Sequence, residues 1–301
     1  MPIRKRRWTE WATSAPSILW LTIFFVIPTL LVVAISFHPA SPDGGIGKEW
    51  TLQTWRHIPN PNYPAIVWRT LWISAATTLG CVVLALPCAF AIARMQKKWR
   101  AVMAGLIMLP FWTSFVVRVF AWRLLLHPEG FLKHVLLSLK LAEPNSQLLY
   151  NSGAILLVSI YSFLPFAIMP IYAAAEKFDF SLLEAARDLG AKSFYAFRKI
   201  FIPGIRRGVI SATLMVFIPS VGSYVIPDLV GGKNSELIGN KIYQRTFPDR
   251  NLPHASALSA VMAIGVLLPL GVVALFLKRQ DRNEMLRIAE SNGVKQRGGA
   301  A

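Results

Sequence analysis

The chain has 301 residues, 54% of them hydrophobic, and its 32 Lys and Arg against 15 Asp and Glu give a formal net charge of +17. This composition is too apolar for a soluble domain of this length and predicts a polytopic membrane protein. A nucleic-acid-binding protein is excluded, because the basic residues lie in the short segments between apolar runs and not on one folded basic domain.

Six apolar runs are long enough to cross a bilayer as helices, since a hydrocarbon core of ~30 Å requires ~20 residues. They cover residues 16–37, 70–93, 101–121, 152–173, 208–230 and 255–277. The first run follows a basic segment as a signal sequence would, but it is too long for one and is kept as a span. The prediction is therefore an all-α fold with a basic N-terminus over residues 1–15, a six-span domain over residues 16–278 and a tail over residues 279–301.

The orientation of the spans follows from Lys and Arg, which are enriched in short cytoplasmic loops. With six spans, 21 of these residues lie on the side of the two termini and 9 on the other side. Both termini are therefore predicted to be cytoplasmic, together with the segment from Ser181 to Pro203. Every predicted span also contains proline, which bends a helix and is tolerated where neighbouring groups or a cavity satisfy the freed carbonyls.

No catalytic or metal site is predicted. Cys81 and Cys88 share one apolar run and are interpreted as small buried hydrophobic residues. The five histidines are scattered without the spacing of metal ligands. The segment from Val230 to Ile242 superficially resembles a phosphate-binding loop but lacks the first glycine and the Ser/Thr of that motif, so no nucleotide is expected on this chain.

Polar and aromatic residues inside the spans are candidates for a substrate pathway. Arg118 is the ionisable residue of the third span, and it either has a functional role or snorkels to the nearby outer end. Polar stripes of this kind also serve as contacts between helices, which is the alternative interpretation. The candidate pathway residues are Trp112, Thr113, Ser114, Arg118, Tyr161, Ser223, Tyr224 and Asp228.

The segment from Ser181 to Pro203 is amphipathic and charged although it lies between two apolar runs. Ser181 and Glu184 match a capping box, which predicts that a short helix begins at Ser181. Gly190 is the expected left-handed residue at its end. A second short helix should present Phe194, Phe197 and Phe201 on one face and end before Pro203.

The spacing of this segment resembles the EAA loop of ABC importer permeases, and it is called the EAA-like loop below. Glu184-Ala185-Ala186, Gly190, Ile200 and Ile202-Pro203 stand at the family's positions, with Ile202 where leucine is usual. The resemblance implies a type I importer permease fold in which this cytoplasmic loop couples to an ATPase. The coupling residues carried over are Glu184, Ala185, Ala186, Gly190, Ala191, Phe197, Ile200 and Pro203.

Three further stretches look like the permease subunits of spermidine/putrescine importers: LPFWTSFVVRVFAW, LPFAIMPIYAAAEKFD and PSVGSYVIPDLVGG with IGNKIYQRTF. This implies a multi-pass protein of the bacterial inner membrane that is not itself an enzyme. Its implied partners are a second, similar permease, two copies of an ATPase that bind ATP and Mg, and an extracytoplasmic substrate-binding protein.

Several alternatives remain open at this point. The substrate could be another small amine or an amino-acid-like solute, since the predicted spans contain no Asp or Glu apart from Asp228 near an edge. An ion-coupled secondary transporter is disfavoured, because that class usually shows inverted repeats and intramembrane acids. A membrane-anchored enzyme would require a nucleophile–base pair or a metal site.

Overall fold

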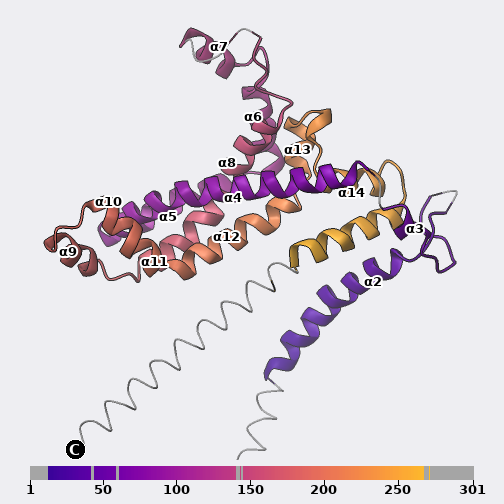
Figure 1. Ribbon diagram of the computed structural model, residues 1–301, viewed down its shortest axis with the longest axis horizontal. Coiled ribbons are helices and arrows are strands. Elements are labelled where there is room, and N and C mark those ends of the chain that lie inside the picture. The colour runs from indigo at the N-terminus through magenta and orange to yellow at the C-terminus, as the bar shows by residue number, and fades with distance from the viewer. Residues whose placement is uncertain are drawn as a thin grey trace, which may run out of the picture. The chain divides into compact units, whose positions relative to one another are not determined.

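The computed structural model describes residues 13–41, 44–58, 61–139, 143, 145–267 and 271. Within these ranges the chain is helical, and the only β-type pairing is an isolated bridge between Ala40 and Ile46. The chain divides into two compact units, one made of Pro59–Asp249 and the other of Met1–Ile58 with Arg250–Ala301. Figure 1 labels helices of both units.

The unit that contains the N-terminal span has one long and one shorter apolar helix. One runs from Thr13 to Ile35 and includes the π-type turn η1 (Thr22–Val26) and α2 (Ile27–Ile35), and the other covers Leu252–Leu267. The loop after α2 carries the short helix α3 (Gln53–Arg56). The Thr51 amide donates a hydrogen bond to the Phe37 carbonyl over 2.7 Å, so the loop folds back onto the end of α2.

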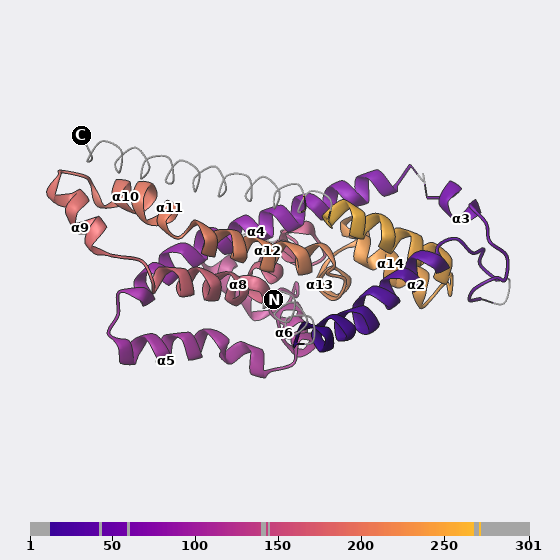
Figure 2. The same ribbon diagram turned by 90° about the horizontal axis from the view of Figure 1, so that it is seen from below.

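The larger unit contains the remaining elements, in chain order α4 (Tyr63–Ala93), α5 (Lys97–Met108), η2 (Leu109–Trp112), α6 (Phe115–Leu125), α7 (Phe131–Ser138), α8 (Ser152–Ala175), α9 (Ser181–Asp188), α10 (Ser193–Ala196), η3 (Phe197–Phe201), α11 (Ile202–Gly204), α12 (Arg206–Val221), α13 (Val225–Val230), η4 (Lys233–Ser235) and α14 (Ile238–Thr246). The elements α9 to α11 lie at one end of the bundle formed by α4, α8 and α12 (Figures 1 and 2). The elements α6, α13 and α14 lie toward its other end.

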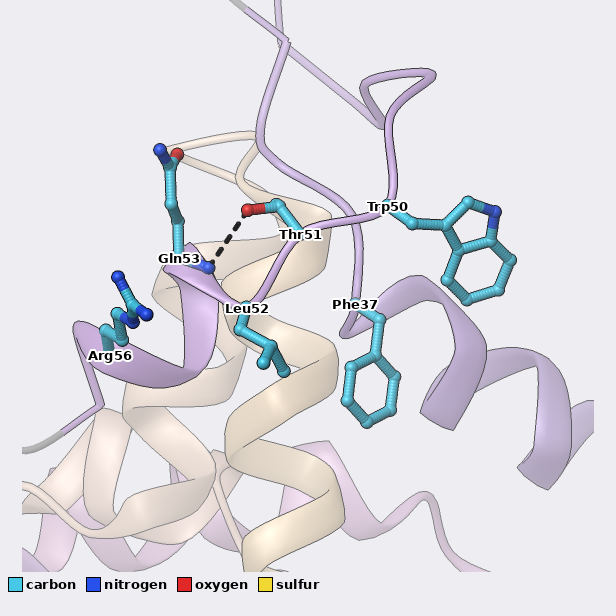
Figure 3. Close-up of a pocket in the computed structure, with 6 residues that line it drawn as sticks. All are labelled: Phe37, Trp50, Thr51, Leu52, Gln53 and Arg56. Carbon is cyan, nitrogen blue, oxygen red and sulfur yellow. Dashed lines mark hydrogen bonds between the residues drawn. The ribbon is translucent and has the colours of Figure 1, made fainter.

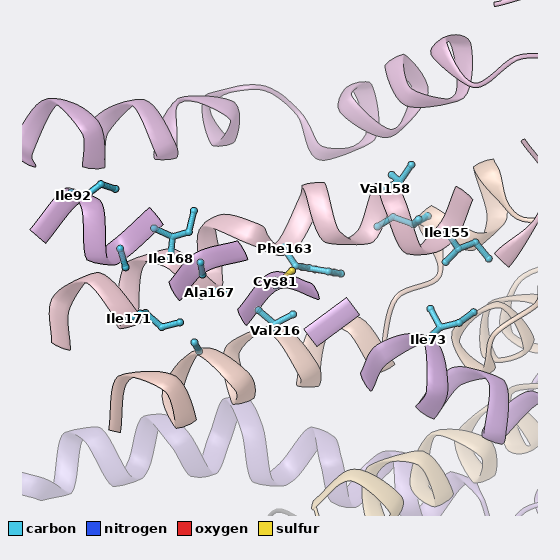
Figure 4. Packing of buried hydrophobic residues seen from close by; sticks show 14 of the residues in the cluster. Ile73, Cys81, Ile92, Ile155, Val158, Phe163, Ala167, Ile168, Ile171 and Val216 are labelled. Carbon is cyan, nitrogen blue, oxygen red and sulfur yellow. The ribbon is translucent and has the colours of Figure 1, made fainter. Parts of the chain in front are cut away.

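The core of this unit is the contact between α4, α8 and α12 (Figure 4). Small side chains occupy its centre, among them Cys81, Ala85, Ala167 and Ala212, all 0% exposed. Small residues let helix backbones approach closely, which is the usual solution for helices in a membrane. The prediction that Cys88 is buried was wrong: α4 turns Cys81 into the core and leaves Cys88 exposed.

Two of the predicted spans are broken. The third consists of Lys97–Trp112 and Phe115–Leu125, which meet at 85° just after Pro110. The fifth is interrupted at residues 222–224, between Pro219 and Pro227, where α12 ends and α13 begins. In contrast, α4 and α8 continue past Pro87, Pro165 and Pro170.

Length and composition qualify three of the described helices to cross a membrane: Thr13–Ile35, Tyr63–Ala93 and Ser152–Ala175. The number rises to five if each bent pair is counted as one span. The sixth predicted run coincides with Leu252–Leu267 at its start, and residues 268–270 and 272–277 lie outside the described residues. The count of six crossings stays a prediction.

Candidate functional site

The EAA-like loop connects α8 with α12, and its first helix, α9, begins at Ser181 as predicted. The predicted capping box was wrong, because Phe180 already has helical dihedral angles and places Ser181 inside the first turn. The Ser181 amide instead donates to the Asp179 carboxylate over 3.0 Å. Hydrogen bonds from the side chain and the backbone of Ser181 hold the pKa of Asp179 below its usual value.

Gly190 ends α9 in the left-handed conformation, with φ of 86°, as the sequence predicted. Its amide donates to the Arg187 carbonyl over 2.8 Å, and the Ala191 amide donates to the Ala186 carbonyl over 3.0 Å. This pair of bonds is a Schellman motif. A Cβ at residue 190 would meet no atom within 4 Å, so only the backbone conformation demands glycine there.

The second helix of the EAA-like loop runs from Ser193 to Gly204, which corrects the predicted end before Pro203. In η3 the Ile202 amide bonds to the Phe197 carbonyl, five residues earlier. Pro203 therefore falls in the first turn of α11, where its missing amide hydrogen is tolerated. The helix ends at Gly204 and bends by 75° into α12.

The apolar residues of the EAA-like loop point in two directions, which corrects the prediction that Phe194, Phe197 and Phe201 share one face. Leu183 and Phe201 are buried in the core, whereas Leu189 is 90% exposed and Phe194 is 74% exposed. The outward-facing residues, named the exposed loop surface, are Leu182, Glu184, Ala185, Leu189, Phe194 and Tyr195. The exposed basic residues of the loop are Arg187, Lys192, Arg198 and Lys199. Exposed apolar patches with a polar rim are typical of protein–protein contacts.

The other coupling candidates support this surface from beneath. Ala186, Phe197 and Ile200 are half-buried and pack against the core. Ala191 supplies one of the two Schellman hydrogen bonds, and Pro203 lies in α11. Each coupling residue carried over from the sequence therefore has a place either on the exposed loop surface or in the framework that shapes it.

The first polar break lies in the third predicted span, at Thr113 and Ser114. The Thr113 hydroxyl donates to the Pro110 carbonyl over 2.8 Å and so satisfies an acceptor beside the break. Trp112 is 87% exposed. Ser114 is exposed as well and has an extended ψ of 134°, which ends the helical path before α6.

The Arg118 side chain turns back toward this break. Its guanidinium carbon lies 4.8 Å from the centre of the Phe111 ring and 5.9 Å from that of Phe115. The Nε atom is buried and has no hydrogen-bond partner in the part of the chain that the structure describes. The two aromatic faces hold this cation beside the first polar break.

The second polar break, at residues 222–224, is supported by the segment IGNKIYQRTF, which the sequence marked for its family resemblance but not for a role at this break. The Asn240 side chain donates to the Tyr224 carbonyl over 3.1 Å, and the Tyr243 ring stacks on Tyr224 with centroids 5.2 Å apart. Gly239 lies so close to Ser223 that a Cβ would be 2.6 Å from its carbonyl oxygen. Asn240 stands 16 residues after Tyr224, so the sequence held no local signal for these contacts.

This supporting segment is anchored to α4. The Ile238 amide donates to the Thr70 hydroxyl over 3.0 Å, and Thr70 is 1% exposed. Glu236 forms an ion pair with Lys241. Burial alone would raise the pKa of Glu236, but hydrogen bonds from Lys241 and Gln244 outweigh it and lower the pKa.

The remaining candidates lie on neighbouring helices, since α6, α8 and α13 pack against one another. The Tyr161 ring of α8 meets Trp122 of α6 edge to face, with centroids 5.2 Å apart. Asp228 is exposed on α13. Arg118, Tyr161 and Asp228 therefore lie on three mutually packed helices, α6, α8 and α13. The first polar break directly precedes α6, and the second directly precedes α13.

A cavity of about 520 Å³ lies in the loop after α2, outside the predicted pathway (Figure 3). Phe37, Trp50 and Leu52 form its apolar lining. Its polar side is formed by Thr51, Gln53 and Arg56, with the Gln53 amide donating to the Thr51 hydroxyl over 3.1 Å. Among the described residues, no group of three or more His, Cys, Asp or Glu side chains could hold a metal ion.

Comparison with known proteins places this geometry in a family. Residues 82–282 match the family described as "Binding-protein-dependent transport system inner membrane component". The spermidine/putrescine transport system permease protein PotB of Haemophilus influenzae is 34% identical over 245 residues, which cover 81% of this chain and 86% of that protein. PotB of Escherichia coli K12 is 32% identical over 81% of this chain and 89% of its own length.

A solved bacterial ABC transporter that imports the acidic polysaccharide alginate has the same fold. Its matching chain superposes with a TM-score of 0.65 at 18% identity and covers 93% of this chain and 96% of its own length. The predicted all-α importer permease fold is thereby confirmed.

Proposed function

The chain belongs to the family of binding-protein-dependent transport system inner membrane components, and from this premise we propose that it carries a polyamine such as spermidine or putrescine across the inner membrane. The observation that carries the proposal is the 34% identity, over 81% of the chain, to a spermidine/putrescine permease. Import would be driven by ATP and Mg bound to a separate ATPase, so this chain is the permease subunit of an ABC importer and has no catalytic role of its own.

The exposed loop surface supports the proposed contact with the ATPase. Leu189 and Phe194 offer a partner large apolar side chains that are 90% and 74% exposed. Glu184 and the exposed basic residues of the loop are charged groups that could orient a partner on this surface. Two ATPase copies would bind two such loops, one on this chain and one on a second, similar permease.

The two polar breaks support the proposed pathway. A polyamine is a flexible cation, and aromatic faces bind cations. Trp112, Tyr161 and Tyr224 offer such faces, and Asp228 offers an exposed carboxylate on α13, which begins directly after Tyr224. Arg118 would repel the substrate unless an acidic group faces it, and the second permease is the proposed source of that group. An extracytoplasmic binding protein would deliver the substrate.

The substrate assignment is tested by uptake into vesicles that contain the complete complex with its binding protein. We expect radiolabelled spermidine or putrescine to accumulate only when ATP is present on the side of the EAA-like loop. Excess unlabelled polyamine should abolish accumulation, whereas excess amino acid should not. Competition by amino acids alone would assign the importer to that solute class.

Membrane orientation is tested with a reporter enzyme that is active only outside the cytoplasm. Because 21 of the 32 basic residues lie on the predicted inner side, fusions after Lys48 or Lys241 should be active. Fusions after Lys97 or Lys192 should be silent. Activity after Lys192 would place the EAA-like loop on the outside and contradict ATPase docking.

A further inference from the structure

Five phenylalanine rings gather where the EAA-like loop meets the helical bundle: Phe90, Phe178, Phe180, Phe197 and Phe201, named the phenylalanine cluster. Phe178 and Phe180 precede α9, whereas Phe197 and Phe201 lie in η3. Phe201 is 0% exposed and meets the other four rings with centroids 4.9–6.2 Å apart. The loop is therefore fixed to its base by ring packing.

Phe90 is the member of this cluster that comes from α4. Its ring lies 6.0 Å from Phe180, 5.2 Å from Phe197 and 4.9 Å from Phe201, with interplanar angles of 60°, 89° and 79°. Edge-to-face packing of this kind is a favoured geometry for aromatic pairs. The chain itself joins the EAA-like loop to α8 and α12, so the Phe90 ring adds α4 as a third helix in contact with the loop.

The N-terminal half of α4 contains Thr70, to which the segment that supports the second polar break is hydrogen-bonded. Thr70 accepts the hydrogen bond from the Ile238 amide, and Asn240, two residues later, binds the Tyr224 carbonyl. Thr70, Ile238 and Asn240 are all buried. Because α4 is one continuous helix of 31 residues, it joins the phenylalanine cluster directly to the segment that holds the break.

We propose that α4 carries displacement of the EAA-like loop to the second polar break, with Phe90 and Thr70 as its positioning residues. The proposal rests on the proposed coupling function, and it identifies α4 as the part of the chain that transmits the movement. Packed interiors do not deform continuously, so a shift of the phenylalanine cluster displaces the helix that packs into it. The displacement then reaches Tyr224 through the buried hydrogen bonds of Ile238 and Asn240.

The test is a double-mutant cycle in the complete reconstituted complex, with Phe90→Ala, Thr70→Val and both together. Each single change should lower polyamine uptake per ATP hydrolysed about tenfold, because mutations along a coupling route change coupling by that order. The ATPase should remain bound, since neither residue lies on the exposed loop surface. The double variant should be no worse than the more impaired single variant, because both changes interrupt one route.

Two control variants separate this role from general damage. Phe90→Leu keeps an apolar side chain in the cluster and should retain at least about half of the coupling. Phe24→Ala removes a ring that lies outside the phenylalanine cluster, on the N-terminal helix, and is 61% exposed. This variant should have no effect. If Phe90→Ala does not insert into the membrane, Phe90→Leu with Thr70→Val gives the same cycle at smaller amplitude.

Three results would overturn the proposal: normal coupling in either single variant, fold-changes that multiply in the double variant, or loss of the ATPase from Phe90→Ala. The last result would assign Phe90 to docking. Failure of the wild-type complex to transport polyamines would instead refute the proposed substrate. Ligand-stimulated ATP hydrolysis of the wild-type complex distinguishes these two kinds of failure.

Discussion

Replacement of Gly190 by valine is expected to abolish nearly all uptake while the subunit still inserts into the membrane. Residue 190 has φ of 86°, and a left-handed conformation costs an ordinary L-residue about 1–2 kcal/mol, more for a β-branched one. Relief of that strain would open the Schellman motif and reorient α9 against the second helix. Uptake and retention of the ATPase in the purified complex should both fall at least about tenfold.

Gly190→Asn is the matched control for this variant. Asparagine is the non-glycine residue that best tolerates the left-handed conformation, and no atom lies within 4 Å of the position a Cβ would take. The two variants therefore differ mainly in backbone strain. The asparagine variant should keep most of the activity, and equal loss in both variants would show that contact with a partner, not backbone conformation, requires glycine. Full activity of Gly190→Val would refute the coupling role of this turn.

Replacement of Gly239 by alanine is expected to give the second-largest loss. A single added methyl group would lie 2.6 Å from the Ser223 carbonyl oxygen and 3.1 Å from the carbonyl carbon, both backbone atoms. Overpacking of this kind costs about 1–3 kcal/mol, and here it acts on the break that positions Tyr224. Uptake should fall roughly five- to a hundredfold at normal membrane abundance, measured in the reconstituted complex.

Gly105→Ala provides the comparison, because nothing lies within 4 Å of a Cβ at that position in α5. Alanine also has the higher helix propensity, so this variant should insert and transport normally. Normal uptake by Gly239→Ala would mean that the second polar break tolerates displacement. Tyr224 would then have to be removed from the proposed pathway.

The features that the sequence predicted correctly depend on few neighbours. Gly190 ends α9 because the left-handed turn is decided within a few residues. The helical character of the chain follows from its long apolar runs, whose backbone groups have to be satisfied within each segment in a membrane. The start of α9 was also predicted, although its cap was assigned to the wrong side chain.

The features that the sequence missed depend on contacts distant along the chain. Whether Asp179 or Ser181 caps α9 is decided by the conformation of Phe180, which packs in the phenylalanine cluster. Pro203 stays inside a helix because η3 shifts the hydrogen bonding, with Phe201 buried in the same cluster. Neither of these contacts can be predicted from the spacing of residues in the sequence.

The polar breaks show the same limit. Pro110, Pro219 and Pro227 indicated bends, but not an 85° turn or an interruption of three residues. The partners of the second break, Asn240 and Tyr243, stand well beyond it in the chain. Their role became visible only when the fold brought the two segments together.

The 85° bend also has a consequence for the surrounding lipid. At ~1.5 Å per residue, Lys97–Trp112 reaches about 24 Å and Phe115–Leu125 about 16 Å, whereas the hydrocarbon core is ~30 Å thick. Neither arm alone matches the bilayer, while Thr13–Ile35 reaches about 35 Å and exceeds it. If all of these segments lie in the membrane, the lipids beside the bend have to thin or the arms have to tilt. Acyl-chain length is then expected to change the local thickness of the bilayer or the tilt of the two arms beside the bend.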